Sequence, residues 1–367
     1  MNISIESDKI TIETLYKQIS VFLVGPGRVG SRLLKQIDSQ ASNLKKRVSI
    51  EIKIIAIADT KKMLFDPKGI NTANWEENLL RSPNKTNLDL FINNMVSLPV
   101  HNKVFIDCTA SDEVVEKYKS VLENGISIVT PNKKSNSRDY KFYEDIRRIT
   151  KEQKVNFLYE TNVGAALPII GTIKDLVNCG DEIIEIKGIL SGALSYIFNS
   201  FVNGKPFSEI VKDAKEKGYT EPDPREDLNG LDVARKLLIL SREIGMKIEL
   251  NDIEVESLVP KEIETNSSVD RFFEELKVYD KYFEAKRNEA LKKGKVLKYV
   301  ATLNNEKIKA GLEEIDKGHS LNSLTGSDNI IYIKTKLYKK HPLVIKGPGA
   351  GADVTAAGIL SDLIKVF

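Results

Sequence analysis

Short apolar stretches rich in β-branched residues alternate with helix-like stretches through the first 160 residues of the chain. Alternation of this kind is typical of βα units whose strands form a parallel sheet. The helical pattern is clearest at 113–123 and 140–153. The predicted strands are 19–24, 50–58, 103–107, 126–129 and 155–159. The pattern therefore predicts an α/β fold with a parallel sheet in the first half of the chain.

Two polar stretches interrupt this alternation. Residues 39–46 are interpreted as a loop inserted between the first predicted helix and the second predicted strand. Residues 60–100 contain prolines and many asparagines, and we expect an insertion there with one helix near 88–95. Neither stretch indicates a function.

A glycine-rich turn follows the first predicted strand and precedes a predicted helix. In a dinucleotide-binding βαβ unit, the first glycine permits the tight turn and the second lets the backbone approach the pyrophosphate. The third lets the helix pack on the strand, while the helix N-terminus faces the phosphates. A glycine turn in another kind of α/β protein is the alternative. The residues predicted to contact the cofactor here are Gly25, Gly27, Arg28, Val29 and Gly30.

Two further turns follow predicted strands, at the edge where parallel sheets bind ligands. Asp59 ends the second strand, where a carboxylate can accept hydrogen bonds from ribose hydroxyls, although it lies further from the glycines than the usual ~20 residues. Thr109 and Ala110 follow the strand 103–107 and are expected to face the nicotinamide side of the cofactor. Cys108 is interpreted as a small buried apolar residue rather than a nucleophile.

The most polar stretch of the second half, 217–230, is predicted to be a loop, and a helix is predicted from 231 to about 244. Asp232 and Lys236 are four residues apart and so lie on one side of that helix. Such a pair is commonly a solvated ion pair. The alternative is a lysine proton donor oriented by a carboxylate. The spacing alone leaves both open.

Composition narrows the class of protein. The chain has 367 residues, 41% of them hydrophobic and 29% charged, which indicates a folded protein of two domains. Its net charge of +3 is not concentrated in any stretch, so nucleic acid is not an expected partner. Two cysteines and three histidines show no zinc-ligand spacing, and no stretch has the length of a membrane span or the order of a secretory signal. We expect no membrane association and a cytoplasmic protein.

Several motifs together resemble homoserine dehydrogenase. The most specific is Tyr219-Thr220-Glu221-Pro222-Asp223-Pro224-Arg225 followed by Asp232-Val233-Ala234-Arg235-Lys236. The others are 130–134 (TPNKK), 188–192 (GILSG) and 349–355 (GAGADVT), so the resemblance spans roughly 20–367. The pattern is similar to the dehydrogenase module of bifunctional aspartokinase/homoserine dehydrogenase enzymes. A kinase and a C-terminal regulatory ACT domain are not expected in the printed sequence, and threonine feedback is accordingly not expected.

The resemblance implies roles for individual residues. It implies that Lys236 is the catalytic acid/base and Asp232 its partner. Lys133 would lie near both cofactor and substrate, and Gly351 would belong to a C-terminal segment that closes the nucleotide site. A monovalent cation such as Na⁺ would be bound by backbone carbonyls, although Ala166 stands where glycine is common; the start of a helix at 163–170 is the alternative. The implied substrate residues are Glu221, Asp227, Lys133, Gly192 and Ala193, and the implied cation ligands are Glu160, Val163, Ala165 and Leu167.

The family fold is a Rossmann-type dinucleotide-binding domain plus a mixed α+β catalytic and dimerization domain. We expect the first at 1–160, with 341–367 returning to it, and the second at 161–340, including a charged helix at 270–293 and strands at 296–303 and 307–312. The implied activity is the NAD- or NADP-dependent interconversion of L-homoserine and L-aspartate 4-semialdehyde, in threonine, methionine and isoleucine biosynthesis, by a homodimer. A non-catalytic NAD(P)-binding regulator on the same fold, or another amino acid semialdehyde dehydrogenase, is the alternative.

Overall fold

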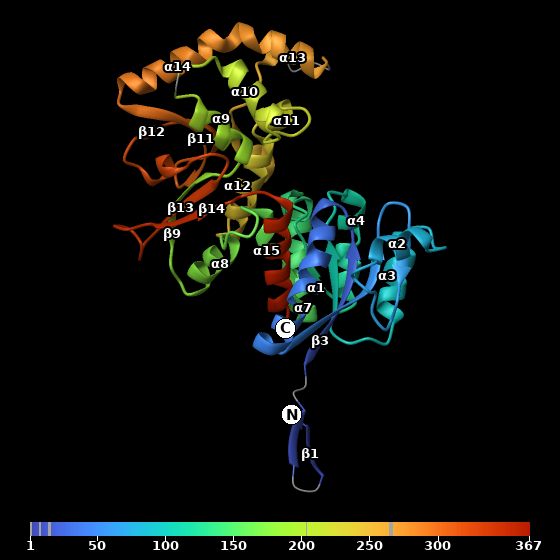
Figure 1. Ribbon diagram of the computed structural model, residues 1–367. Helices are drawn as coiled ribbons and strands as arrows, with labels where there is room; N and C mark the ends of the chain where they lie inside the picture. The colour runs from blue at the N-terminus through green and yellow to red at the C-terminus, as the bar shows by residue number, and fades with distance from the viewer. Residues whose placement is uncertain (1, 7–8, 14–15, 203, 264–266) are drawn as a thin grey trace. The chain divides into compact units, whose positions relative to one another are not determined.

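The computed structural model describes residues 2–6, 9–13, 16–202, 204–263 and 267–367. These form two compact units (Figure 1). Unit 1 comprises residues 1–135, 141–161 and 352–367, and unit 2 comprises 136–140 and 162–351. The segment that returns to unit 1 is shorter than the predicted 341–367, because the strand Leu343–Gly347 pairs within the sheet of unit 2.

Unit 1 is built on a six-stranded sheet in the order β5-β4-β3-β6-β7-β8. All neighbouring pairs are parallel except β4 with β5, and the strand order reverses between β3 and β6. Ligands of doubly wound sheets bind at such a reversal, outside the carboxyl ends of the strands. The strands are β3 (Lys17–Val24), β4 (Ile50–Ala58), β5 (Met63–Phe65), β6 (Lys103–Asp107), β7 (Ser127–Val129) and β8 (Phe157–Leu158), with a separate hairpin of β1 (Asn2–Glu6) and β2 (Lys9–Glu13).

The helices of unit 1 differ from the predicted ones in two places. The polar stretch 39–46 is not a loop but part of the first helix, because its polar residues cover the exposed side while Ile37 and Leu44 are buried on the other. The predicted helix 113–123 is divided into two at Lys117. The helices are α1 (Arg28–Val48), α2 (Trp75–Arg81), α3 (Leu88–Ser97), α4 (Asp112–Glu116), α5 (Tyr118–Glu123), α7 (Tyr140–Gln153) and α15 (Ala352–Lys365), with α6 (Lys134–Ser137) at the boundary between the units.

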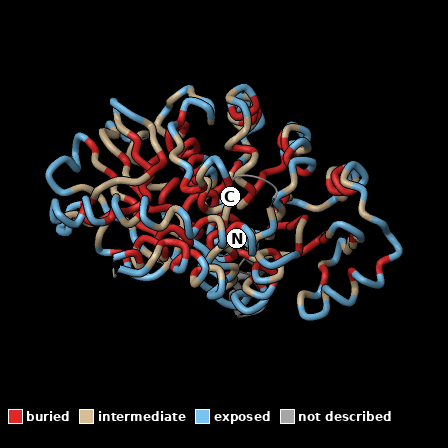
Figure 2. The backbone as a smooth tube through the Cα atoms, turned by 90° about the horizontal axis from the view of Figure 1, so that it is seen from above, coloured by how far each residue is buried: buried red, intermediate tan, exposed pale blue. Residues whose placement is uncertain are grey.

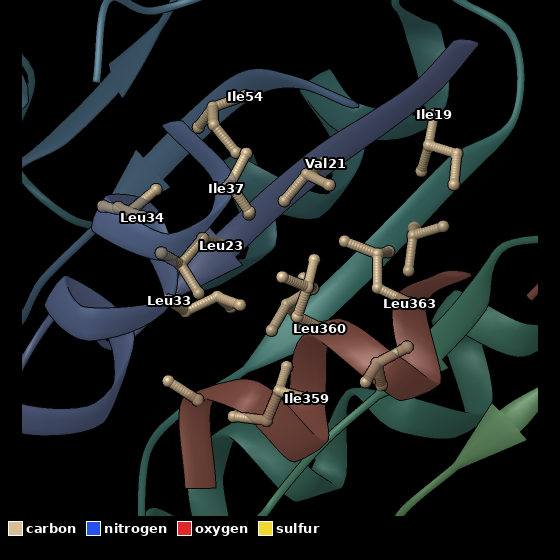
Figure 3. Close-up of a cluster of buried hydrophobic side chains, with 14 of the residues drawn as sticks. Ile19, Val21, Leu23, Leu33, Leu34, Ile37, Ile54, Ile359, Leu360 and Leu363 are labelled. Carbon is tan, nitrogen blue, oxygen red and sulfur yellow. The ribbon is translucent and has the colours of Figure 1, made fainter. Parts of the chain in front are cut away.

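An apolar core joins β3, α1 and the C-terminal helix of unit 1 (Figure 3). Each buried Ile or Leu side chain contributes about 1.5–3 kcal/mol relative to an exposed one. The core therefore holds the first helix and the last helix of the chain against one strand. The labelled side chains are Ile19, Val21 and Leu23 of β3, Leu33, Leu34 and Ile37 of α1, Ile54 of β4, and Ile359, Leu360 and Leu363 of α15.

Unit 2 contains a mixed six-stranded sheet in the order β10-β12-β11-β9-β13-β14. Only β10 and β12 run parallel; the other neighbours are antiparallel. Buried and exposed stretches alternate along the backbone (Figure 2), and most residues of β11 and β13 are buried. The strands are β9 (Ile183–Ile189), β10 (Glu254–Val255), β11 (Lys295–Asn304), β12 (Ile308–Asp316), β13 (Asn329–Thr335) and β14 (Leu343–Gly347).

The helices of unit 2 correct two predictions. The charged stretch 270–293 forms two helices joined by a 3₁₀ turn (Lys277–Tyr279), and the polar loop 217–230 contains a short helix. Residues 163–168 form turns, so the helix considered there begins only at Ile170. The helices are α8 (Ile170–Asn178), α9 (Gly192–Ser200), α10 (Phe207–Glu216), α11 (Arg225–Leu228), α12 (Leu231–Glu243), α13 (Val269–Leu276) and α14 (Asp280–Lys292).

Candidate active site

The glycine turn of unit 1 uses each of its three glycines differently. Gly25 has φ +87°, and a Cβ there would lie 2.7 Å from Thr109 Cγ2. A Cβ on Gly30 would lie 2.4 Å from the carbonyl oxygen of Gly25. Apart from its two chain neighbours, no atom in the described part of the chain comes within 4 Å of a Cβ built on Gly27. Gly25 and Gly30 are therefore required by the protein's own packing, whereas the space beside Gly27 is open to a ligand.

The N-terminus of α1 opens onto the same turn. The helix starts at Arg28 with Gly27 as its N-cap, and among the described side chains none caps it. Its first turn carries no acidic residue. The backbone N–H groups of this first turn, which include those of Arg28 and Val29, can thus bind an anion, and the helix dipole favours a negative charge there. The turn fits the pyrophosphate of a dinucleotide.

A pocket of about 660 Å³ lies beside the glycine turn and is lined by Gly25, Asp59, Thr109 and Ala110 among others. Four of the predicted cofactor residues are thus brought together. Asp59 Oδ1 accepts hydrogen bonds from the backbone N–H groups of Lys61 and Lys62, each at 2.6 Å, which holds the carboxylate at the end of β4. Arg28 instead lines a second pocket, of about 690 Å³, so the structure places Arg28 and Asp59 on different pockets.

The two lysines after Asp59 have different surroundings. The Lys62 amine donates to the carbonyl of Ser82 at 2.6 Å, whereas Lys61 is exposed. Of the two lysines considered for binding a 2′-phosphate, Lys61 is therefore the better placed to turn toward a ligand.

A buried hydrogen-bond network lies beneath the turns that carry Thr109 and Lys133, and the sequence analysis missed it. Its centre is Asp107, the last residue of β6, which is fully buried. The position of an acidic residue at a strand end, before the Thr109 turn, is the only sequence signal for it. Burial, together with the charge of Asp107, raises the pKa of the neighbouring Cys108 thiol well above its usual value, so this thiol is not a ready nucleophile.

In unit 2, the ion pair on α12 is largely buried at its cationic end. Lys236 is 8% exposed, and its Nζ lies 2.8 Å from Asp232 Oδ2. The same Nζ donates to the backbone carbonyl of Leu190 at 2.6 Å. The Asp232 side chain is 45% exposed, so its charge reaches solvent while the amine is held inside. This arrangement is not the solvated surface pair that the spacing alone also allowed.

The loop before α12 brings a second acidic group toward this pair. Asp227 Oδ2 accepts a hydrogen bond from the backbone N–H of Glu221 at 2.8 Å, so the loop is closed onto α11. Burial, with smaller contributions from the charges of Glu221 and Asp232, raises the pKa of Asp227 to about 6. The Glu221 side chain is exposed. The carboxylates of this loop can bind a cationic group, and the buried lysine can act as a proton donor or acceptor.

The residues after β9 complete this half of the site. Leu190, whose carbonyl binds Lys236, is followed by Ser191, whose Oγ caps α9 by accepting from the Leu194 N–H at 3.2 Å. Gly192 and Ala193 are the first residues of α9. A Cβ on Gly192 would lie 3.1 Å from the carbonyl oxygen of Ser327, so the helix start is closely packed. Unit 2 thus connects the predicted Gly192 and Ala193 to Lys236 through Leu190.

The predicted cation loop and Gly351 lie at the boundaries of the units. Glu160 belongs to unit 1, whereas Val163, Ala165 and Leu167 belong to unit 2. Gly164 and Ala165 are both left-handed, with φ +77° and +53°, which turns the chain sharply. The Leu167 carbonyl accepts a hydrogen bond from the Ile169 N–H at 2.8 Å. Gly351, with φ +116°, is the last residue of unit 2 before α15.

Two absences among the described residues bear on the class of protein. Across residues 2–6, 9–13, 16–202, 204–263 and 267–367, no cluster of three or more His, Cys, Asp or Glu side chains could hold a metal. In the same part of the chain, no helix is both long enough and apolar enough to cross a membrane.

Comparison with known proteins identifies the family. The family model for homoserine dehydrogenase matches residues 168–364, and the model for the homoserine dehydrogenase NAD-binding domain matches residues 25–160. Homoserine dehydrogenase of Schizosaccharomyces pombe is 40% identical over 359 residues, covering 95% of each chain. The chloroplastic bifunctional aspartokinase/homoserine dehydrogenase 2 of Arabidopsis thaliana is 42% identical over 351 residues, which is 95% of this chain and 38% of that protein. The chain spans about two fifths of the length of the bifunctional relatives.

Solved structures of other proteins have a similar fold. A crystal structure of a Candida auris protein described as of unknown function has a TM-score of 0.88 at 37% identity, covering 95% of this chain and 98% of that one. A putative homoserine dehydrogenase of Archaeoglobus fulgidus has a TM-score of 0.78 at 25% identity, covering 95% and 99%. Fold and site together define a two-domain protein with a Rossmann-type, NAD-binding first domain. The chain belongs to the homoserine dehydrogenase family.

Proposed function

We propose that this protein interconverts L-homoserine and L-aspartate 4-semialdehyde with NAD or NADP, in the biosynthesis of threonine, methionine and isoleucine. The observation that carries the proposal is the buried Lys236, held by Asp232 and the Leu190 carbonyl beside an acidic loop. A solvated ion pair would need neither burial nor a second, backbone acceptor. The glycine turn and the family's NAD-binding domain support the cofactor class.

The residues of unit 2 would divide the chemistry between them. Glu221 and Asp227 bind the substrate ammonium, and Gly192 and Ala193 border its carbon chain. Lys236 gives a proton to the aldehyde oxygen on reduction and takes one from the hydroxyl on oxidation, while Asp232 keeps the amine oriented. The bound nicotinamide supplies or accepts the hydride.

The residues of unit 1 would hold the cofactor. Gly27 and the first turn of α1 receive the pyrophosphate, Asp59 accepts hydrogen bonds from the adenosine ribose, and Thr109 and Ala110 border the nicotinamide. Lys133 contacts cofactor and substrate from its turn, and Gly351 precedes the segment that closes the nucleotide site. The fixed Asp59 supports use of NAD, with NADP bound as well through Lys61.

Cofactor choice gives the first test of these assignments. Asp59→Asn keeps the oxygen that caps its own turn but removes the charge that repels a 2′-phosphate. We expect the ratio of kcat/KM for NAD over NADP to fall about tenfold or more, because a charge-assisted hydrogen bond to the ribose is weakened as well. Asp66→Asn is the matched control, since Asp66 Oδ1 caps its own turn at the Lys68 N–H (2.9 Å) but lies on another pocket. A ratio that stays at the wild-type value would remove Asp59 from ribose recognition.

The raised pKa of Asp227 gives a pH-dependent test. If its carboxylate binds the substrate ammonium, protonation below about pH 6 removes that contact. We expect kcat/KM for homoserine to fall about tenfold per pH unit on the acidic side of pH 6, and Asp227→Asn to lose this limb of the profile. Glu226→Gln, on the same short helix, serves as the control. An acidic limb near pH 6 that persists in Asp227→Asn would assign it to another group.

Two further properties belong to the proposal. Carbonyls of Glu160, Val163, Ala165 and Leu167 bind a monovalent cation such as Na⁺. The sharp turn at Gly164 and Ala165 supports this, and activity independent of Na⁺ and K⁺ would contradict it.

The chain forms a homodimer, for which the exposed edge strand β14 offers one pairing surface. A monomer in analytical ultracentrifugation would contradict that assembly.

The proposal is tested by measuring NADH and NADPH oxidation with aspartate semialdehyde. Turnover with this aldehyde, and with no other semialdehyde of similar size, is the expected result. Tight cofactor binding without turnover of any aldehyde would instead indicate a non-catalytic NAD(P)-binding protein on the same fold.

A further inference from the structure

A fully buried carboxylate links the two cofactor-side turns of unit 1. Asp107 Oδ1 accepts a hydrogen bond from the Thr109 N–H at 2.7 Å. Asp107 Oδ2 accepts from the Tyr118 hydroxyl at 2.6 Å and from Asn132 Nδ2 at 3.0 Å. All three donors are neutral, and removing a carboxylate from water is costly unless its oxygens are well satisfied. Such a group is retained where it holds particular segments in place.

Asn132 forms the bridge between the turns. Its Nδ2 also donates to the Ser111 carbonyl at 3.2 Å, and its backbone N–H donates to Thr130 Oγ1 at 2.9 Å. Its Oδ1 accepts from the Lys134 N–H at 3.1 Å, which closes a tight turn around Lys133. One amide therefore connects the Cys108–Ser111 turn to the turn that presents Lys133. Thr130 adds a further link, because its hydroxyl donates to the Asp107 carbonyl at 2.9 Å.

The three donors around Asp107 require a side chain that accepts hydrogen bonds and donates none. An amide at position 107 would have to present its NH₂ either to the Thr109 N–H or to the Tyr118 hydroxyl and the Asn132 amide. Burial, and then the charge of Asp107, strongly raises the pKa of Tyr118, which keeps its hydroxyl protonated and donating. A carboxylate satisfies all three donors at once.

We propose that Asp107 and Asn132 are positioning residues that fix the backbone around Lys133, so that the Lys133 side chain is oriented toward bound cofactor and substrate. The inference rests on the proposed role of Lys133 and deepens the proposed function. Asn132 acts through Lys133, without itself contacting the ligand.

A double-mutant cycle between Asn132→Ser and Lys133→Met tests this positioning. The serine retains an oxygen that can accept from the Lys134 N–H, but it loses the amide that reaches Asp107. Dissociation constants for NADH and NADPH, measured by fluorescence titration, give a readout independent of turnover. We expect each single variant to bind more weakly by about tenfold, and the double variant to bind no more weakly than Lys133→Met alone.

Two controls separate positioning from simple stability. Asn132→Ser combined with Lys134→Met should give additive effects, because the Lys134 side chain is paired with exposed Asp112. Tyr118→Phe removes a hydroxyl that is hydrogen-bonded to Asp107 and Thr130, but it leaves the hydrogen bonds of Asp107 to the Thr109 N–H and the Asn132 amide. It should therefore lower the melting temperature but leave both dissociation constants within about twofold of wild type. Additive effects of Asn132→Ser and Lys133→Met would overturn the proposal. Wild-type protein that binds NADH or NADPH but lacks homoserine dehydrogenase activity would contradict the proposed function while leaving this coupling measurable.

Discussion

Lys236→Ala is expected to lower kcat by about 10²–10⁴, the loss typical of a removed general acid/base. The amine is buried and is positioned by Asp232 and the Leu190 carbonyl, and the alanine side chain that replaces it has no proton to give or take. Cofactor affinity should stay close to wild type, because Lys236 lies in unit 2 and the glycine turn in unit 1. The measurement is steady-state oxidation of homoserine together with fluorescence titration of NADPH.

The same helix supplies controls for that experiment. Arg235→Ala removes an exposed neighbouring charge and should leave kcat within about twofold. Asp232→Asn should cause a smaller loss than Lys236→Ala, since it removes the orienting charge and leaves the amine. Wild-type turnover by Lys236→Ala would exclude the proposed proton transfer.

Gly27→Ala is expected to weaken NADH and NADPH binding by about 5- to 150-fold, which corresponds to about 1–3 kcal/mol for an overpacked contact. In the described part of the chain, no atom beyond the two chain neighbours lies within 4 Å of the added methyl group, so the protein without ligand should keep its melting temperature. The methyl group would occupy the space that the pyrophosphate needs. Isothermal titration and differential scanning calorimetry separate the two effects.

Gly30→Ala is the matched comparison for Gly27→Ala. Its methyl group would lie 2.4 Å from the Gly25 carbonyl oxygen, so this variant should lose stability as well as affinity. If Gly27→Ala binds both cofactors as tightly as wild type, the pyrophosphate does not lie at this turn.

Several local features of the fold could be predicted from the sequence. The helix 140–153 and the strand 50–58 are as predicted, because the helix keeps a helical spacing of apolar residues and the strand is a short apolar stretch rich in isoleucine. The stretch 39–46 was wrongly predicted as a loop because its polar residues hide a helical pattern in which only Leu44 is buried. The stretch 270–293 was wrongly predicted as one helix. Its charged residues are compatible with a 3₁₀ turn at Lys277–Tyr279 as well as with a continuous helix, so the sequence does not mark the break.

The candidate site likewise has local features that the sequence predicts and long-range contacts that only the tertiary structure shows. Sequence alone determined the glycine turn after β3, and it placed Asp232 and Lys236 on one side of a helix, because both depend on neighbours within a few residues. Tertiary structure decided that Lys236 is buried against the Leu190 carbonyl, 46 residues away in sequence. It also decided that burial raises the pKa of Asp227, and that Asp107 joins turns more than twenty residues apart. Burial and hydrogen bonding between distant segments depend on which strands and helices pack together, and the spacing of residues within one segment does not specify that packing.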